Sequence, residues 1–154
     1  MKDPHPQIWP ELCEMIGVGV QIDATTASNR IYLLRSALEV DAPSCIKEIA
    51  LKAIAGCIAT YTCEATARMV YSEIDNNRMK TNALLKLFEE YVTDTDDKLC
   101  TAAVSGICRM LNQGLHMFPS ALCCCLLRYF DQACPPRAYA KLKNFFDLYP
   151  TSDE

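Results

Sequence analysis

The sequence predicts an all-α chain of about eight helices that pack in antiparallel pairs. Apolar residues recur at steps of three and four positions along most of its length, the spacing of one buried helix face. Ala, Leu, Met, Lys and Glu outnumber the β-branched and aromatic residues, which favours helix over strand. Short polar turns separate the periodic segments and leave little room for a sheet.

Two segments show the strongest periodicity. The first follows Pro43-Ser44, a typical helix start, and its inward positions are Ile46, Ile49, Ala50, Ala53, Ile54, Cys57, Ile58 and Tyr61. The second runs from Asp97 to Asn112, with Leu99, Ala103, Gly106, Ile107, Met110 and Leu111 on one stripe. Acidic residues at its N-terminal end and Gly114 after its C-terminal end are typical helix boundaries.

Six further helices complete the prediction. We expect them at about Ile8–Val20, Thr25–Leu38, Cys63–Ile74, Met79–Val92, Pro119–Phe130 and Pro136–Tyr149. Gly17 and Gly19 weaken the first of them, by about 1 kcal/mol each relative to alanine. The last presents one set of apolar and aromatic side chains, expected to form either core or a seam between repeats, which are Tyr139, Leu142, Phe145, Phe146 and Tyr149. Residues 1–154 are expected to form a single α-helical repeat domain, less regular over 1–43, that is either complete or a fragment of a longer solenoid.

An internal similarity indicates repeats. Residues 53–58, Ala-Ile-Ala-Gly-Cys-Ile, align with residues 103–108, Ala-Val-Ser-Gly-Ile-Cys, at an offset of about 50 positions. This offset is close to the period of HEAT-type helical hairpins. Gly56 and Gly106 occupy the middle of the apolar face in both copies, where small residues allow close helix packing. Chance similarity between two amphipathic helices is the alternative.

Composition excludes several classes of protein. The hydrophobic fraction of 51% and the charged fraction of 22% are those of a globular chain and not of a disordered one. No apolar run is long enough to span a bilayer, and residues 1–6 lack the pattern of a signal peptide, so a soluble intracellular protein is expected. The net charge of −4 argues against strong, independent binding of nucleic acid.

The chain has ten cysteines, and most of them fall inside apolar helical stretches. Because a buried thiol behaves as a small hydrophobic group, we expect most to be reduced and structural, in a reducing compartment. There is no Cys-x-x-Cys motif. Cys123, Cys124 and Cys125 cannot all face one core, so at least one of them is expected at the surface.

No catalytic constellation stands out. His5 lies in a Pro-rich terminus and His116 in a short turn, and nothing near Cys123 marks it as a partner for His116. Phosphate-loop, dinucleotide-binding and zinc-protease motifs are absent. Residues 94–97, Asp-Thr-Asp-Asp, lack the glycine and glutamate of a calcium loop and are interpreted as a turn before a helix. The sequence thus predicts no catalytic residue, no cofactor and no metal site.

Basic side chains on polar helix faces are the candidates for partner contacts. Arg137, Lys141 and Lys143 are the residues we select for contact with an acidic partner or the DNA backbone. Lys47 and Lys52, beside Glu48, lie on a similar face. Ordinary solubility is the competing interpretation of both groups.

The last third of the chain resembles a known family. Residues 102–111 resemble the Ala-x-x-Gly-Leu-x-Lys-Leu-Leu helix in the C-terminal region of the HEAT-repeat G subunit of condensin (the condensin subunit 3 family). Residues 126–131 are similar to that family's Leu-Leu-x-Tyr-Phe-Asp-Pro stretch, and residues 142–149 to its ending in Phe-Phe-Pro-x-Tyr. Residues 46–56 are similar to the preceding repeat. Asp147 in place of proline and Ser105 in place of an acidic residue depart from the pattern.

This resemblance implies a non-catalytic scaffold of a chromosome-condensing complex, located in the nucleus and on chromosomes, and also in the cytoplasm. Its implied partners are a kleisin subunit and the chromosome-structuring ATPases, with DNA bound only as part of the complex. Neither a membrane nor a small-molecule substrate is implied. Two alternatives stay open: another HEAT-type adaptor, for example in transport or trafficking, and a small helical protein that depends on thiols or a metal.

Overall fold

The computed structural model describes residues 8–39, 41–114 and 118–148 and contains eight α-helices in these ranges. They are α1 (Ile8–Ile22), α2 (Ala24–Glu39), α3 (Ser44–Tyr61), α4 (Cys63–Val70), α5 (Asn77–Val92), α6 (Asp97–Gln113), α7 (Pro119–Tyr129) and α8 (Pro136–Leu148). These ranges contain no strand, so the all-α prediction is confirmed. His5, His116 and Tyr149, named in the sequence predictions, lie outside the described residues.

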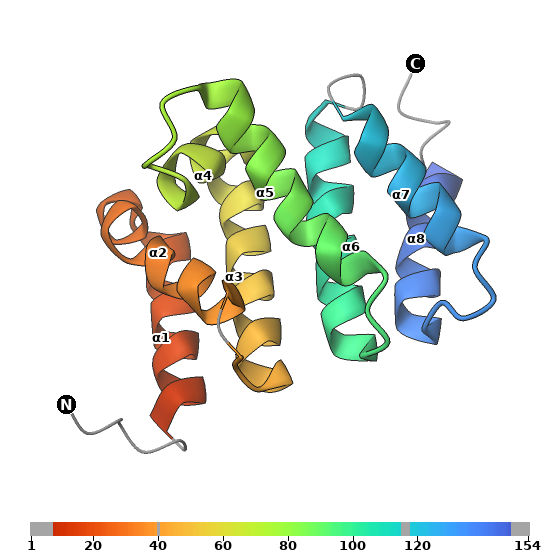
Figure 1. Cartoon of the computed structure of the whole chain (residues 1–154), viewed down its shortest axis with the longest axis horizontal. Coiled ribbons are helices and arrows are strands. Elements are labelled where there is room, and N and C mark those ends of the chain that lie inside the picture. The colour runs from red at the N-terminus through yellow and green to blue at the C-terminus, as the bar shows by residue number, and fades with distance from the viewer. Residues whose placement is uncertain (1–7, 40, 115–117, 149–154) are drawn as a thin grey trace.

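The helices form two layers. Helices α1, α3, α6 and α8 run side by side in the same direction, each in contact with the next (Figure 1). Helices α2, α4, α5 and α7 return across one side of that row. Adjacent helices therefore pack in pairs, as expected for a HEAT-like stack. None of the described helices combines the length and the apolar character that a membrane span requires.

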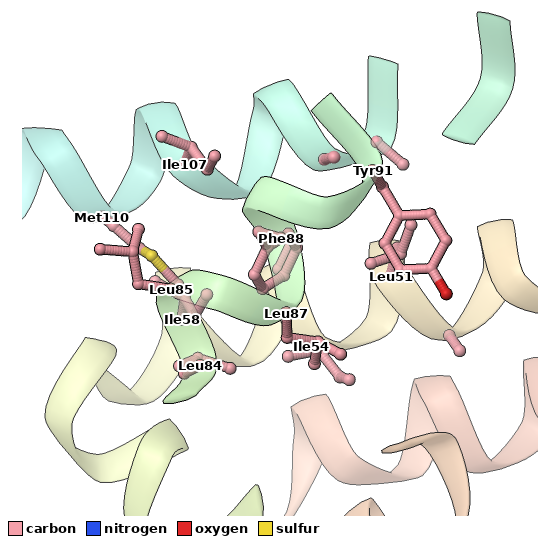
Figure 2. Close-up of a cluster of buried hydrophobic side chains, with 14 of the residues drawn as sticks. Leu51, Ile54, Ile58, Leu84, Leu85, Leu87, Phe88, Tyr91, Ile107 and Met110 are labelled. Atoms are coloured by element: carbon pink, nitrogen blue, oxygen red, sulfur yellow. The ribbon is translucent and has the colours of Figure 1, made fainter. Parts of the chain in front are cut away.

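The core lies between the two layers. Phe88 of α5 is fully buried and sits between α3 and α6, with Ile54, Ile58 and Ile107 around it (Figure 2). Burying such a side chain removes its apolar area from water, which stabilises the fold by about 1.5–3 kcal/mol per residue. The inward positions predicted for the two most periodic segments are all buried or half-buried. Helical periodicity thus identified the core face correctly.

Helix α4 is shorter than predicted. It ends at Val70 and not near Ile74, and a side chain from another helix binds its last carbonyl. The guanidinium of Arg35, on α2, donates a 3.1 Å hydrogen bond to the Val70 carbonyl and lies 4.4 Å from the ring centroid of Tyr71. Arg35 also pairs with Glu73 in the following turn. These contacts hold the backbone after Val70 out of the helix.

The aspartates before α6 form the predicted turn. Asp96 is the N-cap of α6, and its carboxylate accepts hydrogen bonds from the backbone N–H groups of Lys98 and Leu99. The carboxylate of Asp94 accepts a 2.8 Å hydrogen bond from the N–H of Asp96. Capping of this kind satisfies N–H groups that have no partner within the helix. The two carboxylates therefore have a structural role.

All ten cysteines are free thiols. Five are buried and three are half-buried, while Cys45 and Cys123 are exposed. In the run of three, Cys123 is exposed, Cys124 half-buried and Cys125 buried, which confirms the prediction for that segment. Burial raises the pKa of Cys57 and of Cys63 to about 11, so both remain protonated at neutral pH.

The candidate partner-binding groove

Three adjoining hollows follow the outer face of the row α1–α3–α6–α8, and we call them together the groove. Their volumes are about 640, 300 and 250 Å³ from the α1 end to the α8 end. The side chain of Arg109 lines all three hollows, so they adjoin one another. Their position follows from the fold, because helices that lie side by side leave a furrow at each junction.

We call the hollow between α6 and α8 the cleft. The residues that line it have the same spacing along both helices. Its walls are Ser105, Cys108, Arg109 and Asn112 on α6 and Lys141, Asn144, Phe145 and Leu148 on α8. Steps of three and four residues place each set on one helix face. The polar groups are two cations, two amides and one hydroxyl, and no lining residue is acidic. Arg109 and Lys141 form no ion pair within the described part of the chain.

The α1–α3 end of the groove has a different charge. Glu14 of α1 and Glu48 of α3 line it together with two cations, Lys52 and Arg109. The ammonium of Lys52 pairs with the carboxylate of Glu48, one turn away on the same helix. Opposite charges are therefore balanced at this end, whereas positive charge prevails in the cleft.

The structure separates the three basic residues that the sequence selected. Lys141 lines the cleft and the adjoining central hollow. Arg137 is exposed and lies 3.8 Å from the carboxylate of Asp97, and the ammonium of Lys143 lies 2.6 Å from the carboxylate of Asp147. Because exposed ion pairs contribute little energy, about 0–1 kcal/mol, both residues can exchange these partners for others. The geometry groups only Lys141 with other groove residues.

Arg109 and Lys52 join Lys141 around the central hollow, and sequence reasoning did not group them. The hollow is lined by Lys52, Ala55, Thr101, Ala102, Ser105, Arg109 and Lys141. Lys52 was noted only beside Glu48, and Arg109 only within the family-like segment. A usable signal existed, since both lie on the polar faces of the two most periodic helices. Which residues lie opposite Arg109 and Lys52 across the groove is set by the packing of the helices.

The cleft also contains a thiol with altered acidity. A hydrogen bond from the Cys125 thiol, aided by the nearby Lys141 ammonium, lowers the pKa of Cys108. The same interaction raises the pKa of Cys125, which is buried. A more acidic thiol is more readily alkylated, but a nucleophile also needs a base and an orienting group to act in catalysis. Among the described residues there is also no group of three or more metal-ligating side chains.

The family-like segment on α7 has a structural role. Arg128 is buried, and its guanidinium donates a 2.7 Å hydrogen bond to the Asp131 carboxylate and a 3.3 Å bond to the Asp94 carbonyl. The Ala133 N–H and Arg128 together lower the pKa of Asp131. Arg128 therefore ties the end of α7 to the turn before α6.

Comparison with known proteins supplies a family. A family model described as nuclear condensing complex subunits, C-terminal domain, matches residues 11–154. No curated protein and no solved structure matches the chain significantly. The match confirms the resemblance found in the sequence and the prediction of a non-catalytic helical-repeat subunit.

Proposed function

Because the chain belongs to the family of nuclear condensing complex subunits, we propose that it is a scaffold that binds a kleisin subunit through the groove. Its further partners are the chromosome-structuring ATPases of a condensin-like complex, which it reaches through the kleisin. DNA is contacted only within the assembled complex, in the nucleus and on chromosomes. A membrane and a small-molecule substrate have no part in this function. A cytoplasmic fraction remains a prediction.

The observation that supports this function best is the row of three adjoining hollows that form the groove. It crosses four helices that run in the same direction, so an extended peptide lying across them would contact each in turn (Figure 1). Stacked helical repeats commonly use such an elongated surface to bind partners. The change from balanced charge at α1–α3 to positive charge at α6–α8 would give the bound peptide a direction.

The first experiment is affinity purification of the tagged chain from its native cells, followed by mass spectrometry. We expect a kleisin and the chromosome-structuring ATPases among the recovered proteins. Their absence from a folded, well-expressed bait would contradict the proposal. It would favour the alternative of another HEAT-type adaptor, whose identity the recovered proteins would indicate.

Charge reversal tests whether the groove is the surface used. We expect Lys141→Glu to reduce kleisin recovery strongly, because Lys141 lines two of the three hollows. Arg137→Glu and Lys143→Glu should reduce it less, since these residues lie outside the hollows and have acidic neighbours. Lys86→Glu, on exposed α5 surface in the other layer, is the matched control. Equal recovery with Lys141→Glu and Lys86→Glu would place the kleisin elsewhere.

A further inference from the structure

The cleft between α6 and α8 has an uncompensated positive charge. Arg109 and Lys141 face it from opposite helices, and its remaining polar groups, Ser105, Asn112 and Asn144, can donate hydrogen bonds. All five groups therefore suit an anion. Lys52, whose ammonium pairs with Glu48, also lines the adjoining hollow, which has no acidic residue in its lining.

The cleft also has an apolar part. Phe145, which is buried, and Leu148, whose side chain is 58% exposed, line it beside Cys108. A ligand that fills the cleft would thus place an apolar group against α8 and an anionic group between the two cations. The volume of about 250 Å³ lies below the range typical of drug-sized ligands and suits single side chains.

The surroundings favour a peptide over a nucleic acid. The groove continues to Glu14 and Glu48, whose carboxylates balance the cations there, so a phosphate backbone that followed the groove would lose its attraction at this end. A DNA duplex has one charge per about 1.7 Å of its axis and needs a long run of cations, whereas the chain has a net charge of −4. A peptide needs only one carboxylate at the cleft and tolerates mixed charge elsewhere.

We propose that the cleft is a receptor for an acidic side chain flanked by an apolar one in an extended peptide. Arg109 and Lys141 bind the carboxylate, and Phe145 and Leu148 contact the apolar neighbour. The identification of this peptide as a kleisin segment rests on the function proposed above. The receptor itself does not, because its chemistry is set by the residues that line it.

The receptor can be tested without a kleisin. In a titration followed by NMR, the capped tripeptide Leu-Glu-Leu should shift the signals of Phe145 and Leu148, and capped Leu-Gln-Leu should not. The shifts should be lost in Arg109→Gln/Lys141→Gln and in Ser105→Glu, and kept in Lys86→Gln/Lys98→Gln, which removes the same charge from exposed residues. Absence of a shift in the unaltered chain, or equal shifts with both tripeptides, would overturn the proposal.

Short overlapping peptides of the kleisin then test the parent chain. The affinity of a binding segment should fall at least about tenfold when its acidic residue is replaced by the corresponding amide. This loss should occur only with a chain that keeps Arg109 and Lys141. If Leu-Glu-Leu binds and no kleisin peptide does, the receptor stands and the kleisin function fails. A short DNA duplex that displaces the tripeptide, with binding lost in Arg109→Gln/Lys141→Gln, would instead identify the cleft as a nucleic-acid contact and overturn the peptide assignment.

Discussion

Helices α3 and α6 carry the internal similarity at an offset of about 50 residues, yet their central glycines face different neighbours. A Cβ on Gly56 would lie 2.1 Å from Oε1 of Gln21, a side chain of α1 in the same layer. A Cβ on Gly106 would lie 2.3 Å from Cε1 of Phe88, a buried ring of α5 in the other layer. The repeated glycine therefore allows close packing within a layer in α3, whereas in α6 it allows close packing between the layers.

The difference shows that a glycine in a repeat leaves room for a neighbouring side chain but does not determine which side chain occupies that room. The amide at the end of the long Gln21 side chain is held by a 2.8 Å hydrogen bond that it donates to the Gly17 carbonyl. The Phe88 ring is enclosed by α3 and α6 and cannot move without disturbing the core (Figure 2). A third glycine also lies at a close helix contact, because a Cβ on Gly17 would lie 3.0 Å from Cβ of Ala53. The glycine that weakens α1 as an isolated helix thus lets it pack closely on α3.

The largest effect is expected from removing the ring that α6 accommodates. Phe88→Ala should lower the free energy of unfolding by about 3–5 kcal/mol, because it leaves a cavity between the layers. Urea denaturation would measure the loss. Leu127→Ala is the control, since the Leu127 side chain is 76% exposed and should cost less than about 0.5 kcal/mol. A loss below about 1 kcal/mol for Phe88→Ala would mean that this ring is not a centre of the core.

The two glycines should differ when a methyl group is added. Gly106→Ala should destabilise the chain by about 2 kcal/mol through overpacking against Phe88. Gly56→Ala should stay within about 1 kcal/mol of the unaltered chain, because the gain in helix propensity offsets the movement of Gln21. Thermal and urea unfolding would measure both.

A double variant tests the assigned neighbour. Phe88→Leu should reduce the cost of Gly106→Ala, because it shortens the group that the new Cβ meets. It should leave the cost of Gly56→Ala unchanged. Equal effects of the two alanine substitutions would show that α3 and α6 are packed alike and would remove the contrast between them.

The thiols that follow the two glycines should differ in reactivity. Cys57 is buried with its pKa raised to about 11, whereas Cys108 lines the cleft with its pKa lowered by the Cys125 thiol. At neutral pH iodoacetamide should modify Cys108 at least about tenfold faster, equivalent to about 1.4 kcal/mol, as measured by mass spectrometry of labelled peptides. The rate at Cys57 should rise with pH towards 11, since only the thiolate reacts.

Removal of the hydrogen-bond donor supplies the control for this prediction. Cys125→Ala should slow the labelling of Cys108 and leave that of Cys57 unchanged. Equal rates at Cys57 and Cys108 in the unaltered chain would contradict the assigned environments. Faster labelling at Cys57 would place its thiol at the surface.

The smallest effect concerns a direct link between the two helices. The Gln113 side chain, at the end of α6, donates a 2.7 Å hydrogen bond to the Ile58 carbonyl and accepts one from the Cys63 N–H. Gln113→Ala should lower stability by about 1 kcal/mol, because two backbone groups at the α3–α4 junction lose a partner. Asn112→Ala, at the neighbouring exposed position, should have less effect. Identical urea midpoints for both variants would show that water replaces Gln113.

Much of the fold was predictable from local pattern. The number of helices, their order and most of their ends followed from apolar spacing and turn residues, since these act over a few residues of the same chain. The buried faces of α3 and α6 followed in the same way. Tyr139 was predicted to lie in the core or in a seam between repeats, and it is 41% exposed and stacked on Tyr129 with 5.1 Å between ring centroids. Periodicity predicted helix α8 correctly, but it did not show that the Tyr139 ring lies at the edge of the buried face of α8.

Contacts between distant segments decided the rest. The end of α4 depends on Arg35 of α2, and the filling of the space at Gly106 depends on Phe88 of α5. The candidate site is of the same kind, because Arg109 and Lys141 meet only through the register in which α6 packs on α8. The sequence by itself determined the helices, their inward faces and the family. Which polar side chains share a hollow was decided by tertiary packing, since the alignment of neighbouring helices is set by the whole core and by no single segment.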